Sequence, residues 1–253
     1  AVGVYSDQDI KQLIASGAIN VGGTDPDSSQ FQPSSFDLRV GGHFYCLPYS
    51  GFSPKGEDLE SYFKRIAKYD FHIDGDTIGF LHKKNVYVVK IQESLHLPET
   101  VYAKTNPKSS IGRIDLHVRL ITKDGRSFDH VPSGYTGELW LELYPRSFDI
   151  ELTKGTTLNQ IMFFDSDTFQ LSKSFLISLN NQFGLAFDTN DVRCPEEMMR
   201  HLIVNDTVHM TASVGTGLVG YYARPDAPPV NLNRRDLPAS EYFYKVYSHN
   251  GSF

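Results

Sequence analysis

The sequence has few residues that could cross-link the chain and no long apolar run that could anchor it in a membrane. Its 253 residues contain two cysteines, Cys46 and Cys194, and no cysteine pair at metal-ligand spacing. A disulfide framework or a zinc ribbon is therefore not expected. No apolar run approaches the roughly 18 residues of a membrane helix, and the first residues lack the regions of a signal peptide. These absences predict a cytoplasmic protein without membrane contact.

Positive charge is also scarce. Lysine and arginine number 24 against 30 aspartates and glutamates, which gives a formal net charge of −6. A protein that coats nucleic acid needs a broad basic surface, so no nucleic-acid partner is expected. A small anion held by a local cluster of cations is still compatible with this composition. Apolar residues make up 40% of the chain, which is enough for a real core.

Most of the chain up to about residue 170 has the pattern of β-structure. One short helix is expected between Ser6, which can cap it, and Gly17, and another within residues 56–69. Strands are expected in seven segments, separated by Gly, Pro, Asn and Asp clusters: 35–41, 76–81, 85–91, 115–121, 138–144, 148–152 and 158–164. This spacing predicts an all-β protein, a small antiparallel barrel or jelly roll.

The chain changes character after this β domain, which is expected to cover residues 1–170. Residues 171–212 are expected to form a connecting segment with one helix, which runs through Met198, Met199 and Leu202. Pro195 suits the first turn of that helix. Residues 213–253 return to a β-like pattern.

Residues 106–113, NPKSSIGR, gather hydrogen-bond donors between two strand-like runs. Lys108 and Arg113 are cations, and Ser109 and Ser110 carry hydroxyls. Together with the backbone N–H groups of a turn, such donors can cradle the oxygens of a triphosphate. The same residue types are ordinary in a solvated turn, so this segment alone leaves both interpretations open.

A glutamate in residues 138–144, ELWLELY, is the candidate for proton transfer. The period of two puts the three leucines on one face and Glu142, Trp140 and Tyr144 on the other. A carboxylate beside two aromatic rings suits a partly dry pocket, where its pKa rises and it can pass protons near neutrality. Considered alone, an exposed strand glutamate is the commoner case. Glu138 is the nearby rival carboxylate.

Four segments, taken in their order, resemble the ordered blocks of the deoxycytidine triphosphate (dCTP) deaminases. They are residues 32–42, 95–116, 132–148 and 154–164, and the resemblance covers roughly residues 5–165. It implies a distorted jelly-roll subunit with the fold of the deoxyuridine triphosphatases, assembled as a homotrimer or a multiple of one. Residues 217–246 further resemble the start of the second half of the longer, internally duplicated deaminases. Residues 213–253 are therefore expected to be a partial second repeat that is cut short.

The resemblance also implies a reaction, the zinc-independent deamination of dCTP to dUTP and ammonia, which supplies dUMP for thymidylate synthesis. Mg²⁺ is implied only as an ion carried by the nucleotide triphosphate, with no metal ligand from the protein. The implied ligands are deoxynucleoside triphosphates: dCTP, dUTP or dTTP. The implied catalytic residues are Glu142, Arg113 and Ser109, and the implied substrate contacts are Lys108, Ser109, Ser110, Arg113 and Tyr135.

Alternatives remain at this point. Zinc deaminases need a His-x-Glu and a Pro-Cys-x-x-Cys motif, and the sequence has neither. The triphosphatases carry an aspartate three positions before the motif tyrosine, where this chain has Pro132, which speaks against simple dUTP hydrolysis. A bifunctional deaminase and diphosphatase that gives dUMP, and a non-catalytic nucleotide-binding subunit, both stay open.

Within the first block, residues 32–42, Asp37 and Arg39 are expected to pair as part of the fold.

Overall fold

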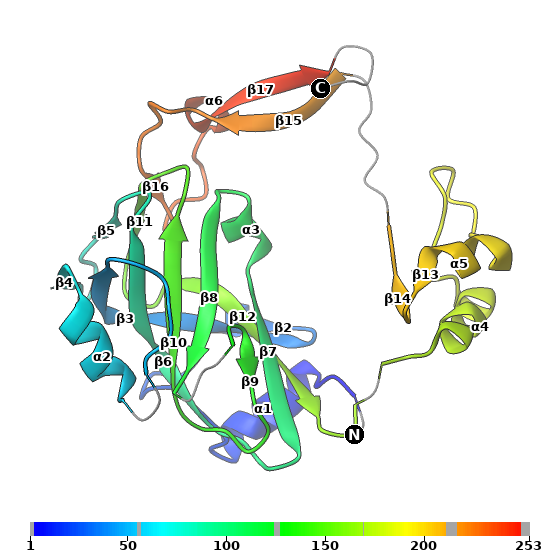
Figure 1. Ribbon diagram of the computed structural model, residues 1–253, viewed down its shortest axis with the longest axis horizontal. Coiled ribbons are helices and arrows are strands. Elements are labelled where there is room, and N and C mark those ends of the chain that lie inside the picture. Colours follow the sequence, from blue (N-terminus) through cyan, green and yellow to red (C-terminus); the bar gives the residue numbers. More distant parts are fainter. Residues whose placement is uncertain (1–2, 55–56, 124–126, 169, 211–216, 249–253) are drawn as a thin grey trace. The chain divides into compact units, whose positions relative to one another are not determined.

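The structure, a computed structural model, describes residues 3–54, 57–123, 127–168, 170–210 and 217–248 (Figure 1). It divides into two compact units. The first comprises Ala1–Asp167 and Tyr221–Lys245, and the second comprises Thr168–Gly220 and Val246–Phe253. The domain boundaries predicted from the sequence, after residues 170 and 212, stay predictions.

The first unit is built on a ten-stranded sheet, which confirms the predicted all-β class. The strand order is β8-β10-β6-β3-β12-β7-β9, with β1 added to β6 and β2 and β4 added to β3. The strands are β1 Ile19–Asn20, β2 Phe31–Gln32, β3 Ser35–Leu47, β4 Tyr69–His72, β6 Val86–His96, β7 Val101–Pro107, β8 Leu116–Thr122, β9 His130–Val131, β10 Thr136–Pro145 and β12 Thr157–Asp165. A smaller sheet joins β5 Gly79–Leu81, β11 Ile150–Leu152 and β16 Val230–Asn231.

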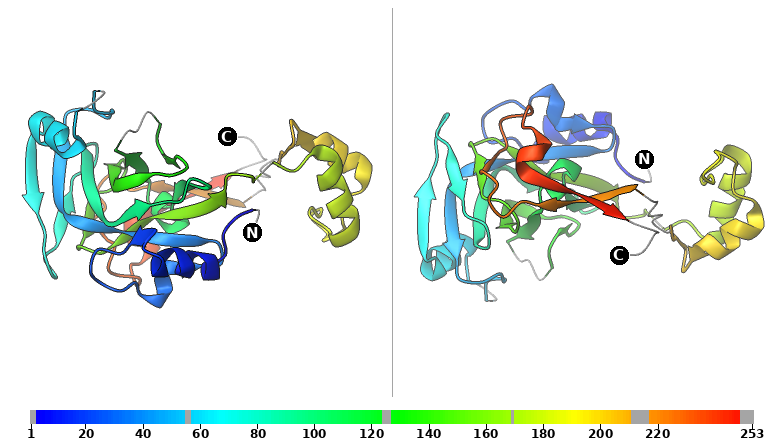
Figure 2. Two further views of the ribbon diagram at one scale, coloured as in Figure 1. Left: turned by 90° about the horizontal axis from the view of Figure 1, so that it is seen from below. Right: turned by 90° about the horizontal axis from the view of Figure 1, so that it is seen from above.

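Asp129 joins the two ends of the large sheet and makes it nearly a closed barrel. Its carboxylate accepts hydrogen bonds from the backbone N–H of Leu120 on β8, at 2.8 Å, and from the hydroxyl of Thr105 on β7, at 3.0 Å. Its backbone also pairs with both residues. Asp129 has a φ of 62°, in the left-handed region that aspartate tolerates better than most residues. The curvature of the sheet can be followed in both views of Figure 2.

Two helices cover the barrel, and both lie where the sequence predicts them. The helix α1, Asp7–Ala15, begins with a capping box in which Ser6 accepts from the backbone N–H of Asp9, and Gly17 follows with a φ of 79°. The helix α2, Leu59–Ile66, buries Leu59, Tyr62 and Phe63. These side chains pack on Trp140 and its neighbours, and form a second core on the outer face of the sheet.

The remaining elements lie outside the two sheets described above. They are the 3₁₀ turn η1 Ser28–Gln30, α3 Ser109–Gly112, α4 Lys173–Phe183, α5 Glu196–Leu202, β13 Ile203–Val204, β14 Thr207–Val208, β15 Gly217–Ala223, α6 Ala239–Tyr242 and β17 Phe243–Ser248. The predicted helix through Met198 is α5, with Pro195 at its N-cap, one position before the first turn. The sequence interpretation missed α4. None of the described helices has the length and apolar character to cross a membrane.

The predicted pairing of Asp37 with Arg39 is wrong. Arg39 instead forms a buried ion pair with Glu93 on β6, with 2.6 Å between Nε and a carboxylate oxygen, and Asp37 accepts from the ammonium group of Lys108. Residues i and i+2 of a strand point the same way but lie about 7 Å apart. The partners found are Glu93 on β6 and Lys108, which follows β7, and the sequence gives no sign of either pairing.

Candidate functional site

Glu142 lies in the middle of β10, between the neighbouring strands β6 and β8. The alternation expected along this strand is present: Leu139, Leu141 and Leu143 belong to the main core, while Trp140 belongs to the outer one. Glu142 shares the outer face of the sheet, opposite Arg119 of β8. The strand therefore presents a carboxylate on the face that carries α2 rather than in the barrel interior.

The carboxylate of Glu142 is buried and only half satisfied. The residue is 5% exposed. The hydroxyl of Ser50, on the loop after β3, donates a hydrogen bond of 2.9 Å to Oε1. Oε2 is buried and has no hydrogen-bond partner among the described residues. Burial raises the pKa of Glu142, while the hydrogen bond from Ser50 and the charge of Arg119 partly oppose this rise.

Glu142 lies at a cleft of about 360 Å³. The cleft is lined by Ser50, Lys84, Val86, His117, Arg119, Glu142 and Tyr144. His117 and Arg119 come from β8, directly across from Tyr144 and Glu142, and the Arg119 guanidinium lies 4.9 Å above the ring of Phe128. A carboxylate of raised pKa beside fixed cations can exchange protons with a bound substrate.

Sequence reasoning missed Ser50, His117 and Arg119 as cleft residues. Alternation along residues 115–121 does place His117 and Arg119 on one face. It does not show which face of which neighbouring strand they meet, because the register of the β8–β10 pair depends on the whole sheet. Ser50 lies on a loop, and no local signal connects it with a glutamate 92 positions away.

The segment NPKSSIGR forms the end of β7 and the one-turn helix α3. Lys108 occupies the N-cap position, and its ammonium group donates to Asp37 and, at 2.9 Å, to the hydroxyl of Thr157. Ser109, Ser110 and Arg113 are exposed. Within the described parts of the chain, the side chains of these three residues have no hydrogen-bond or ionic partner. They are thus available to an outside ligand, whereas Lys108 is already engaged.

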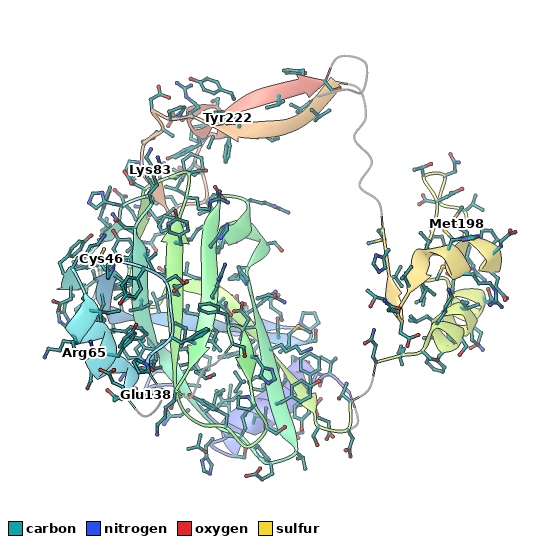
Figure 3. The ribbon with its side chains drawn as sticks, in the orientation of Figure 1. Cys46, Arg65, Lys83, Glu138, Met198 and Tyr222 are labelled. Atoms are coloured by element: carbon teal, nitrogen blue, oxygen red, sulfur yellow. The ribbon has the colours of Figure 1, made fainter. Side chains whose placement is uncertain are left out.

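Arg113 lines a second cleft, of about 450 Å³, with a strong excess of positive charge. Its cations are Lys83, Lys84, Arg113, Arg146 and Arg224, and its one acidic residue is Asp115. Figure 3 labels Lys83 and Tyr222, which line this cleft from the loop after β5 and from β15. Lys84 lines both clefts, so the cationic cleft adjoins the cleft of Glu142. Both lie within the first unit.

Comparison with known proteins identifies the family. Residues 1–167 match the N-terminal domain family of the 2'-deoxycytidine 5'-triphosphate deaminases. The chain belongs to this family. The resemblance inferred from the four sequence blocks is thereby confirmed, and the proposed site residues all lie within the matched range.

Individual relatives agree with this assignment. The chain is 31% identical over 144 residues to "dCTP deaminase, dUMP-forming" of Methanothermobacter thermautotrophicus, which covers 55% of this chain and 67% of the relative. It is 30% identical over 144 residues to "dCTP deaminase" of Colwellia psychrerythraea, which covers 54% and 69%. The crystal structure of 2'-deoxycytidine 5'-triphosphate deaminase from Agrobacterium tumefaciens matches 98% of this chain and 71% of its own, with a TM-score of 0.84 and 26% identity.

Tyr135, the remaining predicted substrate contact, holds the backbone in place. It is buried, its hydroxyl donates to the carbonyl of Glu138 at 2.6 Å, and it accepts from the backbone N–H of Lys123 at 2.9 Å. Tyr135, Lys108, Ser109 and Ser110 line neither of the two clefts. A single chain therefore brings Arg113 and Glu142 into adjoining clefts and keeps the two serines apart from them.

Proposed function

We propose that this chain deaminates dCTP by hydrolysis, with Glu142 as the general base. The observation that carries the proposal is the half-satisfied carboxylate: Ser50 holds Oε1, and buried Oε2 has no partner within the described residues. The names of the relatives support dCTP as the substrate. The exposed alternative for Glu142 that the sequence left open does not fit a residue that is 5% exposed.

The proposed chemistry is one proton shuttle. Glu142 takes a proton from a water molecule as its oxygen bonds to C4 of cytosine, and the proton is passed to N3. Glu142 then transfers the proton of the new C4 hydroxyl to the amino group, the C4–N bond breaks, ammonia leaves, and the C4 oxygen becomes the carbonyl of uracil. A carboxylate whose pKa is raised by burial is a better acceptor and donor near neutrality than an exposed one. Positive charge from Arg119 and Arg113 would stabilise the charge that develops on the ring.

The triphosphate would be held by residues 108–113. Ser109, Ser110 and Arg113 offer side-chain donors, which suit phosphate oxygens, and Lys108 adds a positive charge at the start of α3. Asp37, whose carboxylate is buried, is already paired with Lys108. Mg²⁺ would be held by the triphosphate oxygens and would neutralise their charge. The proposed reaction uses no zinc.

We further propose a homotrimer in which each site is shared between subunits. Ser109 and Ser110 lie outside both clefts of their own chain, so the serines and the glutamate of one chain do not form a complete site. A neighbouring subunit that docks its α3 segment at the Glu142 cleft would complete it. A location in the cytoplasm stays a prediction.

A second candidate is a bifunctional enzyme that also releases pyrophosphate and forms dUMP. The relative from Methanothermobacter thermautotrophicus is named dUMP-forming, which favours it. Pro132, which replaces the aspartate of the triphosphatases, argues against it. Deamination to dUTP therefore remains our main proposal.

One assay separates these functions. The purified protein is incubated with dCTP and Mg²⁺, nucleotides are resolved by chromatography, and ammonia and pyrophosphate are quantified. Equal amounts of dUTP and ammonia support the deaminase. Equal amounts of dUMP, ammonia and pyrophosphate identify the bifunctional enzyme. Pyrophosphate without ammonia identifies a triphosphatase, and bound nucleotide without products identifies a non-catalytic subunit.

A further inference from the structure

Away from both clefts, two histidines and an aspartate meet where β4 pairs with β3. His43 of β3 lies directly across from His72 of β4, and Asp70 lies two positions before His72. Nε2 of His43 lies 2.7 Å from Oδ2 of Asp70, and Nε2 of His72 lies 4.0 Å from the same oxygen. One ligand atom from each side chain falls within 4.8 Å of the other two. None of the three residues lines the cleft of Glu142 or that of Arg113.

Behind His43, a relay of hydrogen bonds fixes its other ring nitrogen. Nδ1 of His43 lies 3.1 Å from the hydroxyl of Tyr45, and that hydroxyl lies 3.3 Å from a carboxylate oxygen of Glu60 on α2. Tyr45 is buried, so its hydroxyl is held in place behind His43. Metal-binding histidines commonly have their second nitrogen held in this way.

Nδ1 of His43 is engaged at the Tyr45 hydroxyl, so Nε2, 2.7 Å from Oδ2 of Asp70, is the ring nitrogen that can bind a metal ion together with that carboxylate. An ionised carboxylate only accepts, so Nε2 reaches Asp70 either by donating its N–H or through a cation that both atoms bind.

We propose that His43, Asp70 and His72 form a binding site for a divalent transition-metal ion of the zinc, cobalt or nickel type. Two imidazoles and one carboxylate are ligands that these ions accept, with water in the remaining position. The ligands are accessible, since the side chains of His43, Asp70 and His72 are 29%, 51% and 70% exposed. Metal–nitrogen distances are about 2.0 to 2.1 Å, so His72, the most exposed of the three, has to move toward Asp70.

The ion would clamp an edge of the barrel. Among the described strands, β4 pairs with β3 alone, so it is held on one side only. A metal ion that joins both strands binds the native arrangement and not the unfolded chain, and must therefore stabilise the fold. The site is proposed as a structural one, and it does not depend on the reaction proposed for Glu142.

Titration of tag-free, chelator-treated protein with Zn²⁺, Co²⁺ and Ni²⁺ tests the proposal by calorimetry and by metal analysis after dialysis. We expect one ion per chain and a rise in the melting temperature. His72→Gln and Asp70→Asn should each weaken binding by more than about 100-fold, the upper end for the loss of a supporting residue. Both residues are exposed, so these variants should fold. His201→Gln, at an exposed histidine on α5, is the matched control and should bind as the wild type does.

Tyr45→Phe separates a built site from adventitious binding. It keeps all three ligands and removes the hydroxyl that orients His43, so metal affinity should fall by about 10- to 100-fold. The Co²⁺ complex of the wild type should show the absorption of a low-coordinate imidazole site, and His72→Gln should not. Absence of binding, or binding that survives in both His72→Gln and Asp70→Asn, overturns the proposal. In either case the dCTP assay is unaffected, so the two proposals fail separately.

Discussion

The hydroxyl of Ser50 donates a hydrogen bond of 2.9 Å to Oε1 of Glu142, 92 residues further along the chain. This contact immobilises one carboxylate oxygen, while Oε2 stays buried without a partner in the described part of the protein. Buried polar atoms without partners are uncommon, because each costs free energy. They are tolerated where function requires them, which is why this pair is central to the predictions that follow.

Glu142→Gln tests the general base. The amide keeps the shape of the side chain and its contact with Ser50 but cannot accept a proton from water. Turnover of dCTP should fall by at least about 100-fold, with nucleotide binding largely retained. Glu138→Gln is the matched control, since Glu138 is an exposed glutamate of the same strand that pairs with Lys90. A Glu142→Gln protein that is folded and deaminates at close to the wild-type rate would place the chemistry elsewhere.

Ser50→Ala should change the pH dependence of the reaction. The hydrogen bond from Ser50 lowers the pKa of Glu142, against the larger rise caused by burial. Without it the pKa rises further, so a higher pH is needed to ionise the base. The acidic limb of the profile of kcat/KM against pH should therefore move to higher pH. Ser50→Thr keeps a hydroxyl and should retain the wild-type profile, and a limb that stays in place or moves to lower pH in Ser50→Ala would contradict this role.

The Glu142 carboxylate should also lower the free energy of unfolding as the pH rises. Its folded-state pKa is raised above the ordinary 4.5, so the native state keeps the proton to a higher pH than the unfolded state does. The stability that this protonation contributes is full below about 4.5 and is lost as the pH rises through the folded-state pKa. Relative to Glu142→Gln, the wild type should thus become less stable as the pH rises above about 4.5. Urea unfolding of both proteins over a series of pH values measures this, and a difference that is constant with pH refutes it.

Ser109 and Lys108 should behave differently when they are replaced. Ser109→Ala removes an exposed hydroxyl and should weaken dCTP binding by about 1.5 to 3 kcal/mol for each charge-assisted hydrogen bond that the hydroxyl would donate, without a change in stability. Ser174→Ala, on α4, is its control.

Lys108→Met leaves Asp37, whose side chain is 2% exposed, without its cation. Breaking a buried pair costs up to about 3 to 5 kcal/mol, and the partial exposure of Lys108 places this one toward the lower end.

The double variant Lys108→Met with Asp37→Asn separates binding from stability. It removes both charges, so much of the stability that Lys108→Met costs should return while dCTP binding stays weak. Thermal unfolding and calorimetric titration with dCTP follow the two properties. A double variant that is as unstable as Lys108→Met would show that the unpaired Asp37 carboxylate is not the cause of the instability.

Mixing two inactive variants tests whether subunits share sites. Arg113→Ala and Glu142→Gln chains are coexpressed and the mixed oligomers are assayed. In a trimer whose sites take Arg113 from one chain and Glu142 from the next, random assortment makes about a quarter of the sites intact. Activity near that fraction supports the shared site. Mixed oligomers without activity would place both residues of a site in one chain, as their adjoining clefts also permit.

Local sequence determined the elements and the faces of this protein. The cap at Ser6 and the glycine at position 17 bound α1 as predicted, because both act within a few residues of the backbone they satisfy. The alternation in residues 138–144 placed Glu142 opposite the leucine face, because successive side chains of a strand point to opposite sides. The order of four short blocks was enough to indicate the family.

Only the tertiary structure decided which side chains meet. Arg39 pairs with Glu93 and not with Asp37, Lys108 is engaged by Asp37, and Ser50 reaches Glu142 from a distant loop. Periodicity assigns a residue to a face, but partners across a sheet depend on strand order and register. Those follow from the packing of the whole barrel. The same reason hides the cluster of His43, Asp70 and His72, whose members look unrelated until β4 lies beside β3.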